Sequence, residues 1–92
     1  MFAIAFDFVV RDTEATHPRG VPQAYADINT LLSRYGFQRV QGSVYISQHD
    51  SLVNVTLAMN ALKALSWFPT CVRDIRAFKV EHWSDFTDFM KS

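Results

Sequence analysis

The chain has 92 residues, of which 49% are hydrophobic and 20% are charged, and its nine basic and nine acidic residues give a formal net charge of zero. A chain of this length buries roughly 60 to 65% of the surface that its unfolded form exposes, which allows one marginally stable domain spanning residues 1–92. The lack of excess Lys and Arg argues against a protein that coats nucleic acid or binds membranes through a basic surface. Cys71 is the only cysteine, so the sequence predicts neither an internal disulfide nor a structural zinc site.

The sequence contains no recognisable targeting or membrane-spanning segment. Residues 1–10 are apolar, but no basic residues precede the run and Asp7 interrupts it, which is unlike a signal peptide. No stretch approaches the ~18 to 20 apolar residues that a membrane-spanning helix needs. We therefore expect a cytoplasmic protein without a membrane partner.

Residues 2–10 predict a β-strand, because aromatic and branched residues dominate the run and a polar segment follows it. Period-two alternation puts Phe2, Ile4, Phe6 and Phe8 on one face and Ala3, Ala5, Asp7 and Val9 on the other. A strand that is apolar on both faces is typical of the centre of a covered sheet, and Asp7 is its one exception.

Two amphipathic helices are predicted further along the chain. The segment from Arg11 to Pro22 is typical of a loop, and Pro22 suits the first turn of a helix that ends at Gly36. Asp50 or Ser51 would cap a second helix that ends before Trp67-Phe68-Pro69. Apolar residues recur at spacings of three and four in both helices: Tyr25, Ile28, Leu32 and Tyr35 in the first, and Leu52, Val55, Met59 and Leu62 in the second.

Three further strands are predicted from alternating patterns. Residues 37–40 and 43–47 alternate on either side of Gly42 and predict a hairpin that turns there. Residues 72–83 alternate with more charge, which is typical of an edge strand. One face of that strand carries Val72, Asp74, Arg76, Phe78 and Val80, and the other carries Arg73, Ile75, Ala77, Lys79 and Glu81. Residues 84–90 predict a short helix that covers an edge or reaches a partner.

The predicted order of elements is βαββαβ, which is the α+β arrangement of the ferredoxin-like fold. Right-handed crossovers put both helices on one face of the four-stranded antiparallel sheet and leave the other face bare. Because the first strand is apolar on both faces, an identical subunit is the simplest cover for the bare face. We therefore expect a homodimer.

Asp7 is the first candidate for chemistry. A carboxylate in a central apolar strand carries a desolvation cost unless it is paired, hydrogen-bonded or bound to a metal. The alternative is that Asp7 lies at the exposed end of the strand or forms a structural pair with Arg73 or Arg76. The residues alone favour that alternative.

Other polar residues have similar pairs of interpretations. Arg73 and Arg76 flank Asp74 and could bind phosphate through their planar guanidinium groups, although charges on an edge strand are usually only solvated. Ser43 could bond a phosphate, or serve only the turn. Tyr45 could stack on a base, or be half-buried core.

The histidines and phenylalanines point to less specific roles. His17, His49 and His82 could act as general bases near neutral pH, but surface roles are expected for the first two. The phenylalanines are expected to fill the core or an interface rather than to stack on bases: Phe2, Phe6, Phe8, Phe37, Phe78, Phe86 and Phe89.

Seven segments along the whole chain carry a family resemblance: Ala3-Ile-Ala-Phe-Asp7, Ala24-Tyr-Ala-Asp27, Tyr35-Gly-Phe37, Gln41-Gly-Ser-Val-Tyr45, Met59-Asn-Ala-Leu62, Val72-Arg-Asp-Ile-Arg-Ala-Phe78 and Trp83-Ser-Asp-Phe-Thr-Asp-Phe89. In these segments the chain resembles the virulence-associated protein D (VapD) family. The motifs QGSVY and VRDIRAF are specific at this spacing. Residues 11–21 match no motif of the family.

The resemblance implies a ferredoxin-like homodimer, related to the small CRISPR-associated nuclease of spacer acquisition. It also implies a bacterial endoribonuclease that is the toxin of a toxin-antitoxin pair. The resemblance further implies catalytic roles for Asp7, Ser43 and Asp74. It implies that Arg73 and Arg76 contact phosphate and that Tyr45 is a neighbouring substrate contact. Two mechanisms remain open: Asp7 of each subunit sharing a Mg²⁺ at the dimer interface, or an Asp activating the ribose 2′-OH without metal.

We therefore expect a toxin that cleaves single-stranded RNA or mRNA and that a cognate antitoxin protein binds. The leading alternative is a non-catalytic ferredoxin-like dimer that binds a protein partner or nucleic acid. A further alternative is a DNA nuclease or scaffold like the CRISPR-associated relative.

Overall fold

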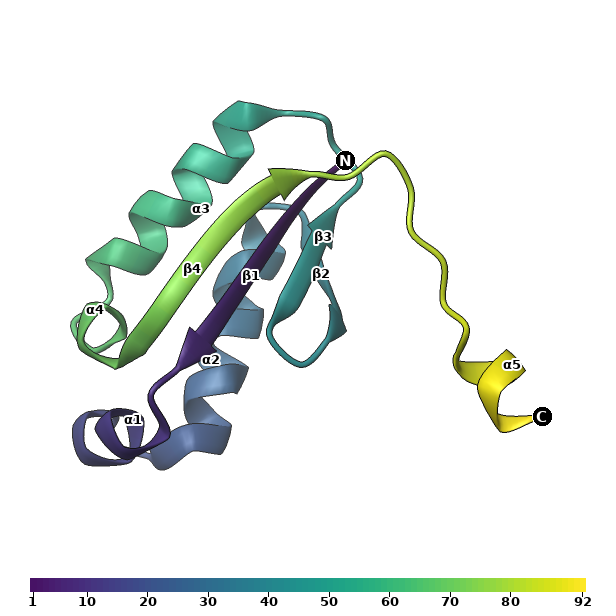
Figure 1. The fold of residues 1–92 in the computed structure, drawn as a ribbon. Coiled ribbons are helices and arrows are strands. Elements are labelled where there is room, and N and C mark those ends of the chain that lie inside the picture. The colour runs from purple at the N-terminus through teal and green to yellow at the C-terminus, as the bar shows by residue number, and fades with distance from the viewer.

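The structure is a computed structural model that describes all residues 1–92. Its four strands form one antiparallel sheet in the order β2-β3-β1-β4. They are β1 (Phe2–Phe8), β2 (Phe37–Gln41), β3 (Val44–Ser47) and β4 (Val72–Lys79). The two long helices, α2 (Gly20–Arg34) and α3 (Leu52–Ala64), lie together behind the sheet in Figure 1. The predicted ferredoxin-like βαββαβ fold is confirmed, with β1 in the centre and β4 at an edge.

Three short helices complete the chain: α1 (Val10–Thr16), α4 (Phe68–Cys71) and α5 (Thr87–Lys91). The prediction of a loop from Arg11 to Pro22 is wrong, because this segment contains most of α1 and the first residues of α2, which begins at Gly20. Helix α1 is held by tertiary packing against α2 and α4, and its buried Thr13 donates a hydrogen bond to the Val9 carbonyl at 2.9 Å. Tertiary packing can stabilise a single short helix that local propensity does not specify. No helix has both the length and the apolar character required to cross a membrane.

Strands β4 and β1 both end earlier than the sequence predicted. Strand β4 stops at Lys79, which lies opposite Phe2, whereas the sequence predicted a strand to residue 83. Beyond Lys79 the two segments are joined at Val80, whose amide donates a hydrogen bond to the Met1 carbonyl at 2.9 Å and whose carbonyl accepts one from the Met1 ammonium at 3.4 Å. Strand β1 likewise ends at Phe8 rather than Val10, because Val10 begins α1.

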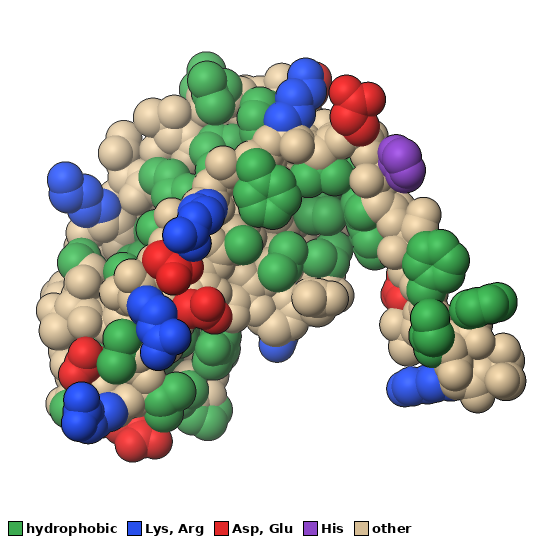
Figure 2. Space-filling view, in the orientation of Figure 1, with side chains coloured by type: hydrophobic (Ala, Val, Ile, Leu, Met, Phe, Trp, Pro, Cys, Tyr) green, Lys and Arg blue, Asp and Glu red, His purple; other side chains and the backbone are tan.

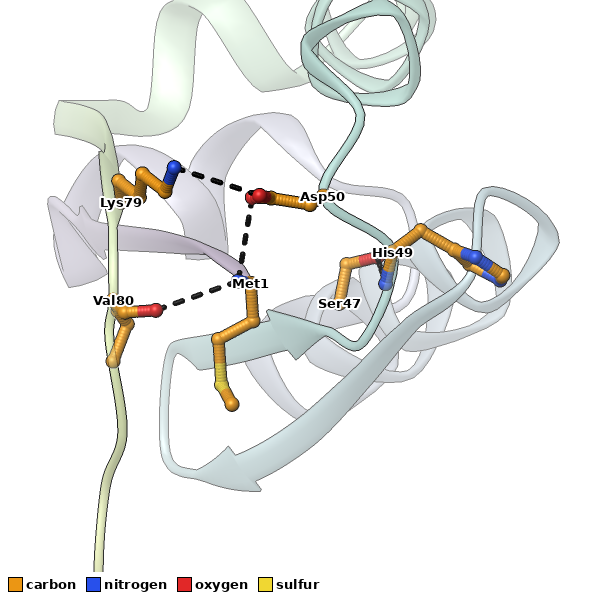
Figure 3. Close-up of polar contacts among 6 residues, drawn as sticks. All are labelled: Met1, Ser47, His49, Asp50, Lys79 and Val80. Carbon is orange, nitrogen blue, oxygen red and sulfur yellow. Dashed lines mark hydrogen bonds and ion pairs between the residues drawn. The ribbon is translucent and has the colours of Figure 1, made fainter.

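The N-terminal residue fixes the point at which the chain leaves the sheet (Figure 3). The Met1 ammonium lies 3.4 Å from Asp50 Oδ1 and 3.4 Å from the Val80 carbonyl, and Lys79 Nζ lies 3.5 Å from Asp50 Oδ2. Lys79 and then the ammonium group lower the pKa of the exposed Asp50 carboxyl. In the same loop the Ser47 hydroxyl accepts a hydrogen bond from the His49 amide at 3.2 Å.

The hydrophobic core lies between the sheet and the helices. Ile4, Phe6 and Phe8 of β1 point into it, as the alternation predicted. The Phe6 ring lies 6.2 Å from the Tyr45 ring and 6.0 Å from the Phe68 ring, centroid to centroid. The Ser51 side chain caps α3 by accepting a hydrogen bond from the Asn54 amide at 3.4 Å, which confirms one of the two predicted caps.

The opposite face of the sheet has no helix over it. The register places three pairs of residues side by side on that face: Ala3 and Phe78, Ala5 and Arg76, and Asp7 and Asp74. Figure 2 views this face and shows acidic and basic side chains gathered over β4 and the end of β1, next to hydrophobic side chains. This open face contains most of the polar residues that the sequence singled out.

Candidate functional site

An open depression of ≈ 360 Å³ lies on the open face where β1, β4 and the β2–β3 turn meet. Asp7, Ser43, Asp74 and Arg76 contribute its polar lining. Apolar lining comes from Ala5, Phe6, Val44 and Phe78. The fold therefore brings together four of the six residues that the family resemblance suggested, from three separate segments of the chain.

Asp7 and Asp74 lie directly opposite each other on adjacent strands. Directly opposed side chains on one face of an antiparallel pair have Cβ atoms about 4.5 to 5.5 Å apart, and two like charges in this arrangement destabilise the sheet. Asp7 is exposed and forms no hydrogen bond or ion pair. The register shift after Asp7 ends the regular pairing at this point. Asp7 therefore lies at the exposed end of its strand, as the non-catalytic interpretation predicted. It does not form the pair with Arg73 or Arg76 that the same interpretation offered.

Arg76 is the cation of the depression. Its Nη1 atom lies 3.0 Å from Asp74 Oδ1, while its side chain remains 73% exposed. The guanidinium can therefore keep this carboxylate contact and still present N–H groups to a ligand in the depression. Asp74 orients the cation, and Asp7 is left free beside it.

Ser43 is positioned by the turn that precedes β3. Its carbonyl accepts a hydrogen bond from the Phe6 amide at 3.2 Å, which ties the turn to β1. The turn itself depends on Gly42, whose φ of 35° few other residues adopt, and on Arg39 Nε, which donates to the Gly42 carbonyl at 2.8 Å. The Ser43 hydroxyl bonds no protein group and is available to a ligand.

Two predicted substrate contacts lie outside the depression. Tyr45 is 1% exposed and packs in the core opposite Ile4, so the structure corrects its assignment as an RNA contact and supports the alternative of a core residue. Arg73 is exposed at the register shift between Val72 and Asp74 and does not line the depression.

Phe78 is a lining residue that sequence reasoning assigned to the core or an interface. Its side chain is 47% exposed and forms one wall of the depression. The signal was present in the alternation of β4, which puts Phe78 on the same face as Asp74 and Arg76. Gln41 also lines the depression and carried no such signal.

His17 is a structural residue, which corrects the expected surface role. Its side chain is 3% exposed, and its ring packs edge-on against Trp67 with the centroids 4.7 Å apart. Nδ1 accepts a hydrogen bond from the Arg19 amide at 3.0 Å, so Nε2 carries the proton and donates to Asp27 Oδ2 at 2.8 Å. Both ring nitrogens are occupied, and His17 therefore has no nitrogen free to act as a general base. His49 and His82 are exposed.

Replacing His17 with alanine is expected to lower the free energy of unfolding by roughly 2 kcal/mol or more, because packing and two hydrogen bonds are lost. Hydrogen bonds from Gln23 and then His17 lower the pKa of Asp27 from its ordinary value of 3.8. This carboxylate therefore stabilises the fold fully above that value, and the stabilisation is lost as the pH falls through the lowered pKa. Urea unfolding at pH 7 and pH 3 measures both effects. His82→Ala is the control and should change stability by less than about 0.5 kcal/mol.

Curated proteins similar to this chain match it over nearly its whole length, although no family model matches it. The Endoribonuclease VapD homolog of Neisseria gonorrhoeae is 56% identical over 92 residues, which is 100% of both chains. The Endoribonuclease VapD of Haemophilus influenzae is 55% identical over 92 residues, again with 100% of both chains covered. The Endoribonuclease VapD of Helicobacter pylori is 43% identical over 94 residues and 100% of both chains. Full-length similarity at this level, together with the ferredoxin-like fold, shows that the chain belongs to the VapD endoribonuclease family.

Proposed function

We propose that the chain cleaves single-stranded RNA in the depression on the open face of the sheet. The observation that carries the proposal is the convergence of Asp7, Asp74, Ser43 and Arg76 at one exposed place. Two carboxylates held side by side at a cost to stability, next to a cation that can bind phosphate, are typical of a site selected for chemistry. Full-length similarity to proteins named Endoribonuclease VapD supports RNA as the substrate.

In the metal-free mechanism, the free carboxylate of Asp7 accepts the proton of the ribose 2′-OH. The 2′-oxygen then attacks the adjacent phosphorus, the bond from phosphorus to the 5′-oxygen breaks, and the 5′-oxygen leaves as a hydroxyl after taking up a proton. Arg76 stabilises the charge that develops on the phosphoryl oxygens, and the Ser43 hydroxyl donates a hydrogen bond to the same group. The products are a 2′,3′-cyclic phosphate and a 5′-hydroxyl.

The residues of the depression also fit a hard cation. Magnesium is often bound through one or two carboxylates, with water in its other positions, and Asp7 and Asp74 are adjacent carboxylates of this kind. No cluster of three or more potential ligands exists within one copy, so a dimer that brings two Asp7 side chains together would supply more oxygen ligands. When bound, the ion would lower the pKa of a coordinated water and so provide the nucleophile.

Cleavage of matched RNA and DNA oligonucleotides, with and without EDTA, tests the proposal. Metal-free cleavage predicts products only from RNA, an unchanged rate in EDTA, and a 2′,3′-cyclic phosphate end. Loss of RNA cleavage in EDTA with recovery in Mg²⁺ would assign the reaction to the metal. Cleavage of DNA as well would favour a nuclease like the CRISPR-associated relative, and no cleavage of either substrate would favour a binding module.

We also propose a biological setting, which the family resemblance suggests. The chain acts in the cytoplasm as the toxin of a toxin-antitoxin pair, and a cognate antitoxin protein restrains it. It acts as a homodimer in which a second copy packs on the apolar part of the open face and leaves the depression accessible to RNA. Support for the dimer comes from Phe78, which is 47% exposed on a face that no helix covers. Cell growth after expression of the chain alone, compared with an Asp7→Asn variant, tests the toxin assignment.

A further inference from the structure

Gln41 is the one polar residue of the depression that has no role in the proposed reaction. The four residues assigned above move the proton and bind the phosphate, whereas Gln41 lines the same depression and takes part in neither step. Its side chain is exposed, and its amide forms no hydrogen bond. This amide is therefore available to a part of the substrate other than the phosphate.

A β-bulge in the edge strand β2 changes the direction of Gln41. In the β2–β3 pairing Arg39 lies opposite Tyr45. Gln41 lies opposite Val44, the preceding residue of β3, so β2 contains one extra residue, Val40. Bulges of this kind redirect side chains and are frequent next to active sites.

Without the extra residue, Gln41 would point to the other face of the sheet. Phe37 begins β2 with its side chain 1% exposed in the core, and strict alternation would place Gln41 on that same side. Directly opposed residues of an antiparallel pair share a face. The observed pairing therefore puts Gln41 beside Val44 on the open face, where both line the depression.

The hairpin turn fixes Gln41 relative to the reacting groups. The Phe6 amide donates a hydrogen bond to the Ser43 carbonyl at 3.2 Å, which ties the turn to β1 near Asp7. The turn lies at the same end of the sheet as the end of β1 (Figure 1). The depression of ≈ 360 Å³ has the size of a site for one small molecule, which is also the scale of a nucleotide. When a phosphate binds Arg76, an adjoining base therefore lies within reach of Gln41.

We propose that Gln41 recognises the base on one side of the cleaved bond by hydrogen-bonding its edge. A glutamine amide carries N–H donors and a carbonyl acceptor close together, and the edges of unstacked RNA bases present donors and acceptors that differ between the bases. An amide that is held in one orientation therefore binds some bases better than others. The inference rests on the proposed RNA cleavage and adds the residue that determines the base preference of the same site.

The test digests one pool of single-stranded RNA of random sequence with each variant and sequences the new ends. The frequency of each base on both sides of the cut bond gives the ratio of the most frequent to the least frequent base. Gln41→Ala should lower that ratio about fivefold or more at one of the two positions, because base-specific hydrogen bonds are lost. Gln41→Glu keeps the size of the side chain but only accepts hydrogen bonds, so it should change which base is most frequent.

Gln38→Ala is the matched control. Gln38 is an exposed glutamine of the same strand, three residues before Gln41, and it does not line the depression. This variant should leave the base ratio unchanged. Because both glutamine side chains are exposed, both alanine variants should fold and should unfold in urea at the same midpoint as the unaltered chain.

The possible results separate this inference from the proposed function. An unaltered chain that cleaves no RNA would refute both. Equal base frequencies on both sides of the cut in the unaltered chain would refute the inference alone. So would a Gln41→Ala variant that keeps the base ratio, including one that cleaves every sequence equally more slowly, and the bulge would then only shape the edge of the sheet. A preference that Gln38→Ala also abolishes would assign the effect to β2 as a whole and not to Gln41.

Discussion

Replacing Asp7 with asparagine is expected to slow RNA cleavage by about 100-fold or more and to raise the free energy of unfolding by a few tenths of a kcal/mol. The loss of rate follows because an amide cannot accept the proton of the ribose 2′-OH and binds a hard cation weakly. The gain in stability follows because the substitution removes one of two like charges that lie opposite each other on β1 and β4. A residue that only stabilised the strand would show the opposite sign in unfolding.

Single-turnover cleavage of an RNA oligonucleotide and urea unfolding measure these two effects on the same preparations. Glu14→Gln is the matched control, because Glu14 is an exposed carboxylate on α1 outside the depression. Asp74→Asn should also slow cleavage, since Asp74 orients Arg76 through their 3.0 Å ion pair. A cleavage rate for Asp7→Asn equal to that of Glu14→Gln would mean that the chemistry occurs elsewhere.

Replacing Tyr45 with alanine is expected to lower the free energy of unfolding by about 3 to 5 kcal/mol, the usual cost of removing a buried aromatic ring. Tyr45 is 1% exposed and stacks on Phe6 near the middle of the core. A domain of this size is stabilised by only about 5 to 14 kcal/mol, so a large fraction of the stability would be lost. Tyr45→Phe keeps the ring and should change both stability and RNA cleavage very little.

The burial of Tyr45 also predicts how the free energy of unfolding depends on pH. Burial raises the pKa of its hydroxyl above the ordinary value of 10.0. The folded state therefore favours the neutral form, and its stabilisation is complete below pH 10 and declines as the pH rises through the raised pKa. Unfolding measured between pH 8 and 11 should show less alkaline loss in Tyr45→Phe than in the unaltered chain. If the Tyr45→Phe variant instead cleaved RNA at least tenfold more slowly while its stability was unchanged, the assignment of Tyr45 to the core would be wrong.

Local patterns were sufficient to predict the architecture. The period-two alternation of residues 2–8 and 74–79, and the three-and-four spacing in α2 and α3, report which side chains face the core. Two positions differ: Leu52 is 64% exposed at the start of α3, and the register shift turns Val72 toward the core rather than the face of Asp74. These patterns depend only on residues close together in the sequence, so the βαββαβ order and the ferredoxin-like fold could be predicted without coordinates. The same alternation placed Asp74, Arg76 and Phe78 on one face of β4.

The remaining features depend on contacts between distant residues. Asp7 faces Asp74 because of the β1–β4 register. Alternation within each strand determines which face a residue occupies, but a shift of the strands by two residues would preserve the faces and change the partner. Tyr45 points into the core because β3 begins at Val44 and pairs Tyr45 with Ile4. Helix α1 forms because α2 and α4 pack against it, although its residues alone are typical of a loop.

The sequence by itself determined which residues alternate, where the two long helices α2 and α3 form and which polar side chains are unusual, because those properties depend on neighbours within about one turn or one strand. Only the tertiary structure decided that Asp7, Ser43, Asp74 and Arg76 meet in one depression and that Arg73 and Tyr45 do not. It also decided that residues 80–92 leave the sheet and run away from the rest of the chain. The physical reason is that convergence requires the β1–β4 register and the contact between the β2–β3 turn and β1, and both join residues that are far apart in the sequence.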